Sequence, residues 1–385
     1  MSHKIVVMVG TRPEVIKMAP VVRELRRRSD TFEPLLVTTA QHRELLDQTL
    51  AAFGLATCAD LDLMTRDQRL PDLTGRAIPA VYDLFDQLAP DGVLIHGDTT
   101  TAFTTALAGF YKGLLVGHVE AGLRSYQRES PFPEEMNRRL IGNLAELHFA
   151  PTHRARLNLL NEGIDPASIW VTGNTVVDAL QQFPHDMPFD DPSLTPLLAQ
   201  RTLLVTAHRR ETLGPPLVSI CRALRTITES FEDVRIVFPL HPNPRVREIV
   251  GGELCGAPRI SLIEPVSYGD FLRLMQRSYL ILTDSGGMQE EAPSMGKPVL
   301  VLRETTERPE LLESGAGVLV GTDAAHIVRC TSRLLRHRGL YDRMAAAPNP
   351  FGDGRAAARI VDVLERRLTG AAPCDQHDRL ALAAS

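Results

Sequence analysis

The chain has 385 residues, of which 44% are hydrophobic and 23% charged, with a formal net charge of -5. This length favours two domains over a single core, and the acidic balance argues against a nucleic-acid-binding surface or an anionic membrane face. Five dispersed cysteines without a CxxC pair indicate a reducing compartment without a zinc site, and the first apolar run is too short for a signal peptide or a membrane span, so we expect a cytoplasmic protein.

Short, β-branched apolar runs recur along the chain, with room for a helix between them. Because they lack polar alternation, they predict strands buried on both faces in parallel sheets. The predicted strands are Lys4–Val9, Pro34–Thr38, Gly92–His96, Leu114–Val119, Leu147–Ala150, Ile169–Thr172, Thr202–Thr206, Val234–Leu240, Arg259–Ile263, Tyr279–Thr283 and Pro298–Leu302. An amphipathic helix is predicted over Val15–Arg28.

The alternation of strands and helices predicts two doubly wound α/β domains. The segment Phe183–Pro196 is rich in Pro and Asp and predicts a linker, so we place the domain boundary before it, near Gly173. This gives an N-terminal domain over 1–172 and a C-terminal domain over 173–352. A last helix, Gly354–Leu368 within 353–369, is expected to pack back on the N-terminal domain, and 370–385 is expected to be a disordered tail.

Ligands of open α/β sheets bind beyond the carboxyl ends of the strands. The loop after the first strand is not GxGxxG, but Arg12 and Lys17 at the start of a helix suit a phosphate-bearing ligand, as they also suit a tight turn with a surface arginine. Asp98, Glu120 and Glu134 follow later strands. Each acid alone fits a helix cap or a helix dipole, but three converging carboxylates indicate acid–base chemistry.

Groups that can bind an anion follow the strands of the second half. His208 and Arg209 follow one strand, His241 the next, and Ser285, Gly286 and Gly287 open a helix after a third. A Ser-Gly-Gly turn exposes backbone N–H groups to a phosphate. Glu291 is placed to bind ribose hydroxyls, and Arg308 lies on the same rim.

In this order, the loops resemble the non-hydrolysing UDP-N-acetylglucosamine 2-epimerases. The resemblance runs from residue 10 to about residue 358 through the stretches GTRPEVIKMAP, HGDTTT, GHVEAGLRS, SPFPEEMNR, VTGNTVVDAL, TAHRRET, TDSGGMQEEAPSMGKPVLVLRETTERPE and NPFGDGRAA. It implies a glycosyltransferase-B-type fold, with two Rossmann-like domains facing a central cleft, and a homodimer. It also implies UDP-N-acetylglucosamine and UDP as ligands, with no cofactor and no metal.

The resemblance also implies roles for individual residues. Asp98, Glu120 and Glu134, together with His208, would be the catalytic groups, and Phe271 would pack near the uracil. The remaining substrate-binding residues would be Arg12, Lys17, Arg138, Arg209, His241, Val266, Ser285, Gly286, Gly287, Glu291 and Arg308.

Three positions bear on a second, regulatory substrate site found in some family members. Gln41 fits that site, but Glu44 stands where those enzymes have Gln, and Asp67 stands where they have Arg. Added acids would repel an anionic nucleotide, which argues against substrate allostery. Two departures are milder: Ala207 replaces a frequent Gly, and Val266 replaces Gln.

The resting C2–H of the sugar is not acidic, so the implied chemistry first eliminates UDP to a 2-acetamidoglucal and then re-adds it after proton delivery to the other face. Departure of UDP needs positive charge and N–H donors at the diphosphate, and proton transfer on two faces needs more than one carboxylate or a mobile one. Three alternatives stay open: a hydrolysing epimerase that releases UDP and free N-acetylmannosamine, a UDP-sugar glycosyltransferase, and a non-catalytic UDP-sugar sensor.

Overall fold

The computed structural model describes residues 2–39, 43–63, 68–183 and 187–370. They fall into two compact units: unit 1 comprises 1–182 and 351–385, and unit 2 comprises 183–350. The boundary lies later than the predicted one at Gly173, because helix α7 contacts α1 and α15 of unit 1. Among the described residues, no helix is both long enough and apolar enough to cross a bilayer.

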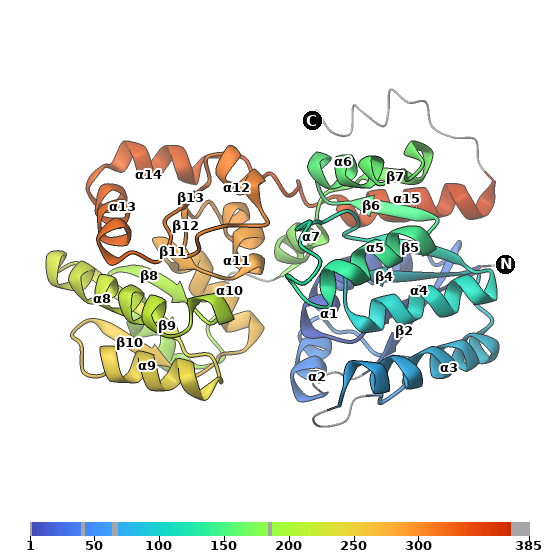
Figure 1. Cartoon of the computed structure of the whole chain (residues 1–385), viewed down its shortest axis with the longest axis horizontal. Helices are drawn as coiled ribbons and strands as arrows, with labels where there is room; N and C mark the ends of the chain where they lie inside the picture. Colours follow the sequence, from blue (N-terminus) through green and yellow to red (C-terminus); the bar gives the residue numbers. More distant parts are fainter. Residues whose placement is uncertain (1, 40–42, 64–67, 184–186, 371–385) are drawn as a thin grey trace. The chain divides into compact units, whose positions relative to one another are not determined.

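Unit 1 is a seven-stranded parallel sheet with strand order β3-β2-β1-β4-β5-β6-β7. Helices α3, α4 and α5 contact one another in sequence and lie in front of the sheet in Figure 1, whereas α1 contacts α2, α7 and α15. The elements are β1 (His3–Val9), α1 (Arg12–Arg27), β2 (Phe32–Thr38), α2 (Arg43–Ala52), β3 (Ala59–Asp60), α3 (Leu70–Leu88), β4 (Gly92–His96), α4 (Thr100–Lys112), β5 (Leu115–Val119), α5 (Glu134–Leu144), β6 (Leu147–Ala150), α6 (His153–Asn161), η1 (Pro166–Ser168), β7 (Ile169–Val171), α7 (Thr175–Gln182) and α15 (Ala356–Thr369).

Unit 2 is a six-stranded parallel sheet with strand order β10-β9-β8-β11-β12-β13. Helix α8 packs between α9 and α13, and the 3-10 helix η4 contacts α10 and α11. The elements are η2 (Pro192–Leu198), β8 (Arg201–Thr206), η3 (Arg210–Thr212), α8 (Pro215–Ser230), β9 (Val234–Pro239), α9 (Pro244–Leu254), β10 (Ile260–Ile263), α10 (Tyr268–Arg277), β11 (Leu280–Thr283), α11 (Gly286–Glu291), η4 (Ala292–Met295), β12 (Val299–Val301), α12 (Pro309–Glu313), β13 (Gly317–Leu319), α13 (Ala324–Arg336) and α14 (Arg338–Ala345).

The predicted fold class, two doubly wound parallel sheets, is confirmed. Each predicted strand forms within two residues of its expected ends. Most of them are buried, as their continuous apolar runs predict, whereas β10 at one edge is half-buried along its length. Strands β3 and β13 were not predicted, since the two residues of β3 form no apolar run and β13 begins with Gly317 and exposes Val318. The predicted linker ends in the 3-10 helix η2, which begins at Pro192.

The strand orders fix where a ligand can bind. In unit 1 the chain winds one way from β1 to β3 and the other way from β4 to β7, so its switch point lies between β1 and β4. In unit 2 the switch point lies between β8 and β11. Loops leave opposite faces of the sheet on either side of such a point and open a crevice at the carboxyl ends of the strands. The loops that begin at Gly10, Gly97, Ala207 and Asp284 border these two points.

Candidate active site

In unit 1, a buried carboxylate joins the two loops at the switch point. Glu14 Oε2 accepts the N–H groups of Gly10 and Thr11 at 2.7 Å each, and Glu14 Oε1 accepts the Thr99 hydroxyl at 2.7 Å. Burial raises the pKa of Glu14. Sequence reasoning assigned Glu14 no role, although the spacing Thr11-x-x-Glu14 is that of a capping box. Its bonds hold the loop after β1 against the loop that carries Asp98.

Glu120 lies at the end of β5 with a left-handed φ of 63° and a buried side chain. Its Oε1 pairs with Lys17 Nζ and accepts the Asn174 side-chain amide at 2.8 Å, while its Oε2 lies 3.2 Å from His96 Nε2. Burial opposes ionisation, but Lys17 and His96 outweigh it and hold the pKa of Glu120 well below its usual range. Glu120 is therefore a carboxylate at neutral pH, held in a backbone conformation of the kind that clusters at functional sites.

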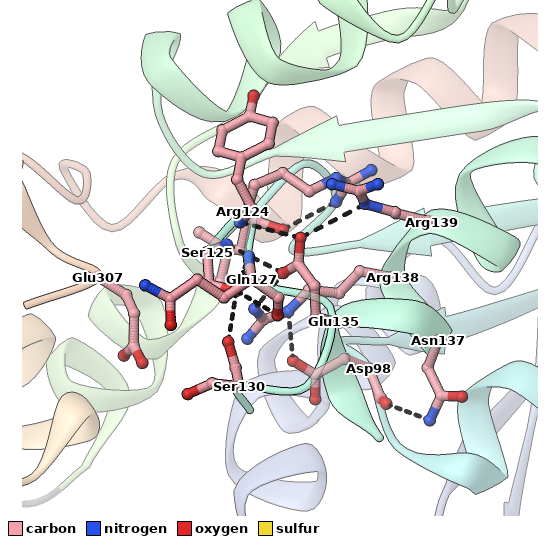
Figure 2. Close-up of polar contacts among 12 residues, drawn as sticks. Asp98, Arg124, Ser125, Gln127, Ser130, Glu135, Asn137, Arg138, Arg139 and Glu307 are labelled. Atoms are coloured by element: carbon pink, nitrogen blue, oxygen red, sulfur yellow. Dashed lines mark hydrogen bonds and ion pairs between the residues drawn. The ribbon is translucent and has the colours of Figure 1, made fainter. Parts of the chain in front are cut away.

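Asp98 follows β4, the neighbour of β5, and is held by α5. Arg138 Nε donates to Asp98 Oδ2 at 2.7 Å, and the Asn137 amide donates to the Asp98 carbonyl at 2.8 Å (Figure 2). Glu134, the first residue of α5, is half-buried. Among the described residues, its carboxylate makes no hydrogen bond or ion pair, so it differs from Asp98 and Glu120 in having no fixed partner.

In unit 2, Asp284 orders the loop after β8. Its fully buried Oδ2 accepts the N–H groups of His208 and Arg209 at 2.7 and 2.8 Å and the Thr212 hydroxyl at 2.8 Å. The His208 ring lies parallel to the His241 ring, with their centroids 5.0 Å apart. Burial and the neighbouring His208 lower the pKa of His241. Neutral His241 then gives His208 a flat, uncharged surface.

Two arginines lie at the Ser-Gly-Gly turn. A Cβ atom on Gly286 would come within 3.3 Å of Arg308 Cζ and 3.4 Å of Arg209 Nη2, so both guanidinium groups pack against this glycine. Arg308 Nε donates to buried Glu290 at 2.9 Å and its Nη1 to Glu307 at 3.1 Å. Although burial opposes it, the charges of Arg308, Arg303 and Arg209 lower the pKa of Glu307. Positive charge and open backbone N–H groups therefore meet at Gly286.

The structure brings together several of the predicted site residues within each unit. Lys17 pairs with Glu120, Arg138 with Asp98, His208 with His241, and Arg209 with Arg308 at Gly286. Arg12 is exposed, and within the described part of the chain it makes no hydrogen bond or ion pair. The other predicted positions are Val266 and Phe271, which are half-buried, Glu291, which is buried, and Ser285 and Gly287 at the start of α11.

Three further residues of the site were missed by sequence reasoning: His96, Asn174 and Asp284, whose roles as partners of Glu120 and of the loop after β8 depend on neighbours distant in the sequence. The only local signal is a polar residue directly at the end of an apolar strand run. Gln41, Asp67 and the side chain of Glu44, the positions on which the argument against a regulatory substrate site rests, lie outside the described residues. No group of three or more His, Cys, Asp or Glu side chains within the described ranges is arranged to hold a metal.

Two doubly wound units of parallel strands, each with polar and charged loops at its switch point, define a two-domain fold of the glycosyltransferase-B type. The same fold occurs in a glycosyltransferase from Rickettsia africae, with a TM-score of 0.61 at 13% identity over 96% of this chain and all of that one. Residues 23–365 match the family model described as UDP-N-acetylglucosamine 2-epimerase. The chain belongs to this family.

The relatives support this membership along almost the whole chain. A putative UDP-N-acetylglucosamine 2-epimerase of Thermotoga maritima is 53% identical over 92% of this chain and 94% of its own length. The Bacillus subtilis UDP-N-acetylglucosamine 2-epimerase is 48% identical over 94% of each. The crystal structure of UDP-GlcNAc 2-epimerase from Neisseria meningitidis bound to UDP-GlcNAc superposes with a TM-score of 0.84 at 42% identity, over 94% of this chain and 99% of that one.

Proposed function

We propose that this protein interconverts UDP-N-acetylglucosamine and UDP-N-acetylmannosamine by inverting C2 without hydrolysis. The C1–O bond to UDP breaks and C2 loses its proton, which gives UDP and 2-acetamidoglucal. A proton then adds to the opposite face of C2, and UDP returns to C1. Atoms and electrons balance without an oxidant or reductant, since the proton and the UDP that leave are both replaced.

Unit 2 supplies the groups that stabilise UDP as a leaving group. Arg209, Arg308 and the N–H groups at Gly286 and Gly287 present positive charge to the diphosphate, with His208 beside them on the same edge of the sheet. The further contacts that we propose are Glu291 with the ribose, Phe271 and the Val266 backbone with the uracil, and Arg12, Lys17, His241 and Ser285 with the phosphates or the sugar.

Unit 1 supplies the carboxylates that move the C2 proton: Asp98, Glu120 and Glu134. The observation that carries the proposal is their placement in the fold: Asp98 and Glu120 follow the adjacent strands β4 and β5, and Glu134 opens the next helix. Simple transfer of a sugar to an acceptor does not need so many acids. This favours epimerisation over glycosyl transfer, which stays the second candidate.

Proton NMR of the protein with UDP-N-acetylglucosamine in D2O tests the proposal. We expect UDP-N-acetylmannosamine to appear with deuterium at C2 in both sugars. UDP with free N-acetylmannosamine would instead identify a hydrolysing epimerase. An unchanged spectrum would contradict both and leave transfer to an acceptor or binding without catalysis.

We also propose that the protein is a homodimer. Phe110 and Tyr111, at the end of α4, are 57% and 59% exposed, and Leu140 on the contacting helix α5 is 43% exposed. Neighbouring exposed apolar side chains of this size mark surfaces that pair with a protein partner. Light scattering of the purified chain should give twice the monomer mass, and Phe110→Glu with Tyr111→Lys should give the monomer; a wild-type monomer would contradict the proposal.

A further inference from the structure

Two adjacent residues of α5, Glu134 and Glu135, have contrasting surroundings. Glu134 has no fixed partner among the described residues, whereas Glu135 is 0% exposed and surrounded by donors. Its Oε2 accepts the Ser125 N–H at 2.9 Å and its Oε1 the Tyr126 N–H at 3.1 Å. Tyr126 has a left-handed φ of 59°, so Glu135 fixes the loop after β5 in a conformation that side chains rarely adopt.

Arg138 connects this buried acid to Asp98. Its Nη1 lies 3.3 Å from Glu135 Oε2, and its Nε donates to Asp98 Oδ2 at 2.7 Å. Figure 2 shows Arg138 between the two carboxylates, with Asn137 reaching the Asp98 backbone from the same helix. The Arg138 side chain is 9% exposed, so it has little room to turn away from these partners.

In this network of Glu135, Arg138 and Asp98, only one carboxylate oxygen of Asp98 accepts a hydrogen bond. Within the described ranges, Oδ1 accepts no hydrogen bond, and the side chain is 24% exposed. The network therefore anchors one carboxylate oxygen and leaves the other available to a substrate. Although burial opposes it, the N–H of Ser125 and the charge of Arg138 lower the pKa of Glu135, so Glu135 remains an anion that holds Arg138.

We propose that Glu135 and Arg138 are positioning residues that aim Asp98 at C2 of the sugar. Arg138 acts on the substrate through Asp98, and Glu135 acts through Arg138. This inference rests on the proposed function, since it presumes that Asp98 exchanges the C2 proton. It assigns Glu135 a role that the resemblance did not imply, and it gives Arg138 a role other than direct substrate binding.

The test compares the full-length protein with Arg138→Met, Glu135→Gln and the double variant, and uses Arg139→Met as the matched control. Arg139 Nε lies 3.5 Å from the same Glu135 carboxylate, but Arg139 has no described contact with Asp98. We measure kcat, KM, the rate of C2 deuterium uptake and the affinity for UDP, with circular dichroism to verify folding. Arg138→Lys replaces the guanidinium group with a single charged ammonium group and serves as the conservative variant.

We expect Arg138→Met to lower kcat and deuterium uptake by about 100-fold, the size of effect that misplacement of a reacting group produces, with UDP affinity unchanged. Glu135→Gln should give a smaller loss in the same direction, and the double variant should be no slower than Arg138→Met, because both act on one group. Arg138→Lys should recover part of the rate, and Arg139→Met should keep the wild-type rate.

Normal kcat in folded Arg138→Met would overturn the proposal, as would additive losses in the double variant. Loss of UDP affinity in step with kcat would show that Arg138 binds substrate directly. If Glu135→Gln does not fold, the comparison of Arg138→Met with Arg138→Lys and Arg139→Met still tests whether Arg138 positions Asp98. Absence of C2 exchange in the wild type would instead contradict the proposed function itself.

Discussion

The two units use the same architecture to present different functional side chains. In unit 1 the carboxyl ends of β4 and β5 lead to the acids Asp98 and Glu120, and α5 begins with Glu134. In unit 2 the corresponding edge presents His208, two arginines and a Ser-Gly-Gly turn. Acids suit proton transfer, and cations with N–H donors suit a departing diphosphate. The difference teaches that a few loop residues, not the sheet beneath them, determine which side chains each unit presents at this edge.

Beneath these charges, each unit stabilises its switch point in the same way. Glu14 joins the loop after β1 to Thr99 after β4, and Asp284, which follows β11, holds His208 and Arg209 after β8. In both units a buried carboxylate bridges the two strands where the winding reverses. A carboxylate suits this position because it accepts several N–H or O–H bonds at once. The buried carboxylates Glu14 and Asp284 thus have structural roles, distinct from the catalytic role that we propose for Asp98, Glu120 and Glu134.

The largest expected effect separates the two units by function. Asp98→Asn, Glu120→Gln and Glu134→Gln should each lower kcat by about 100- to 10,000-fold, the contribution of one positioned acid or base, while UDP affinity stays near the wild-type value. Steady-state kinetics and calorimetric titration with UDP measure the two quantities. Normal turnover in all three variants would show that the acids of unit 1 are not the proton-transfer groups.

The reciprocal change in unit 2 is expected to be smaller and to act on binding. Arg308→Met removes a charged donor from the turn at Gly286, and a hydrogen bond to a charged group contributes about 1.5–3 kcal/mol. UDP should therefore bind roughly 10- to 100-fold more weakly, as measured by titration calorimetry. His326→Gln, on α13 of the same unit, is the control. Unchanged UDP affinity in Arg308→Met would contradict the expected difference between the units, in which unit 2 binds UDP and unit 1 transfers the proton.

The two buried carboxylates that bridge the loops at the switch points, Glu14 and Asp284, provide a third test. Asp284→Ala removes the oxygen that accepts two backbone N–H groups and a hydroxyl, so these buried donors lose their acceptor at a cost of about 1–3 kcal/mol. Chemical denaturation should show this loss, and UDP affinity should fall because His208 and Arg209 are no longer held. The matching Glu14→Ala variant should also lose stability but should lose less UDP affinity, because the loop that Glu14 holds leads to Arg12, one of several proposed ligand contacts. Equal losses of UDP affinity in the two variants would mean that the two bridging carboxylates do not differ in their effect on UDP binding.

Sequence reasoning located the sheets well and the supporting contacts poorly. The strands are visible because burial on both faces leaves continuous apolar runs such as Gly92–His96. The acids and cations at strand ends are visible because the carboxyl edge of a parallel sheet is where ligands bind. The side chains that hold them, such as Asn174 beside Glu120, come from segments far apart in sequence.

The pair Glu134-Glu135 shows the same limit at two adjacent residues. Both acids fit the first turn of a helix equally well in sequence. Only the packed loop at Ser125 and Tyr126 distinguishes the buried Glu135 from its neighbour. The division of the chain into units differs from the predicted boundary for a similar reason: α7 packs on α1 and α15, and nothing in the local sequence VTGNTVVDAL indicates these partners.

The smallest expected effect concerns the closure of unit 1, which, unlike unit 2, is built from two separate stretches of chain. Asp178 on α7 is buried and accepts the N–H groups of Ala356 and Ala357, the first residues of α15, at 3.2 and 2.8 Å. These are donors that a helix start leaves unpaired. Burial raises the pKa of Asp178 to about 6, although both N–H groups oppose this shift, and the nearby Asp353 adds to it.

Because the folded-state pKa of Asp178 exceeds its unfolded value, the native protein holds a proton that the unfolded chain has released between these two pKa values. The unfolding free energy should therefore fall as the pH rises through about 6, by about 1 kcal/mol between pH 5 and 7 from this group. Asp178→Asn should remove that slope while costing stability at pH 5, where the protonated acid is stable. Urea denaturation of both proteins at the two pH values measures the difference. Parallel pH dependence in wild type and variant would mean that Asp178 does not titrate in the folded unit.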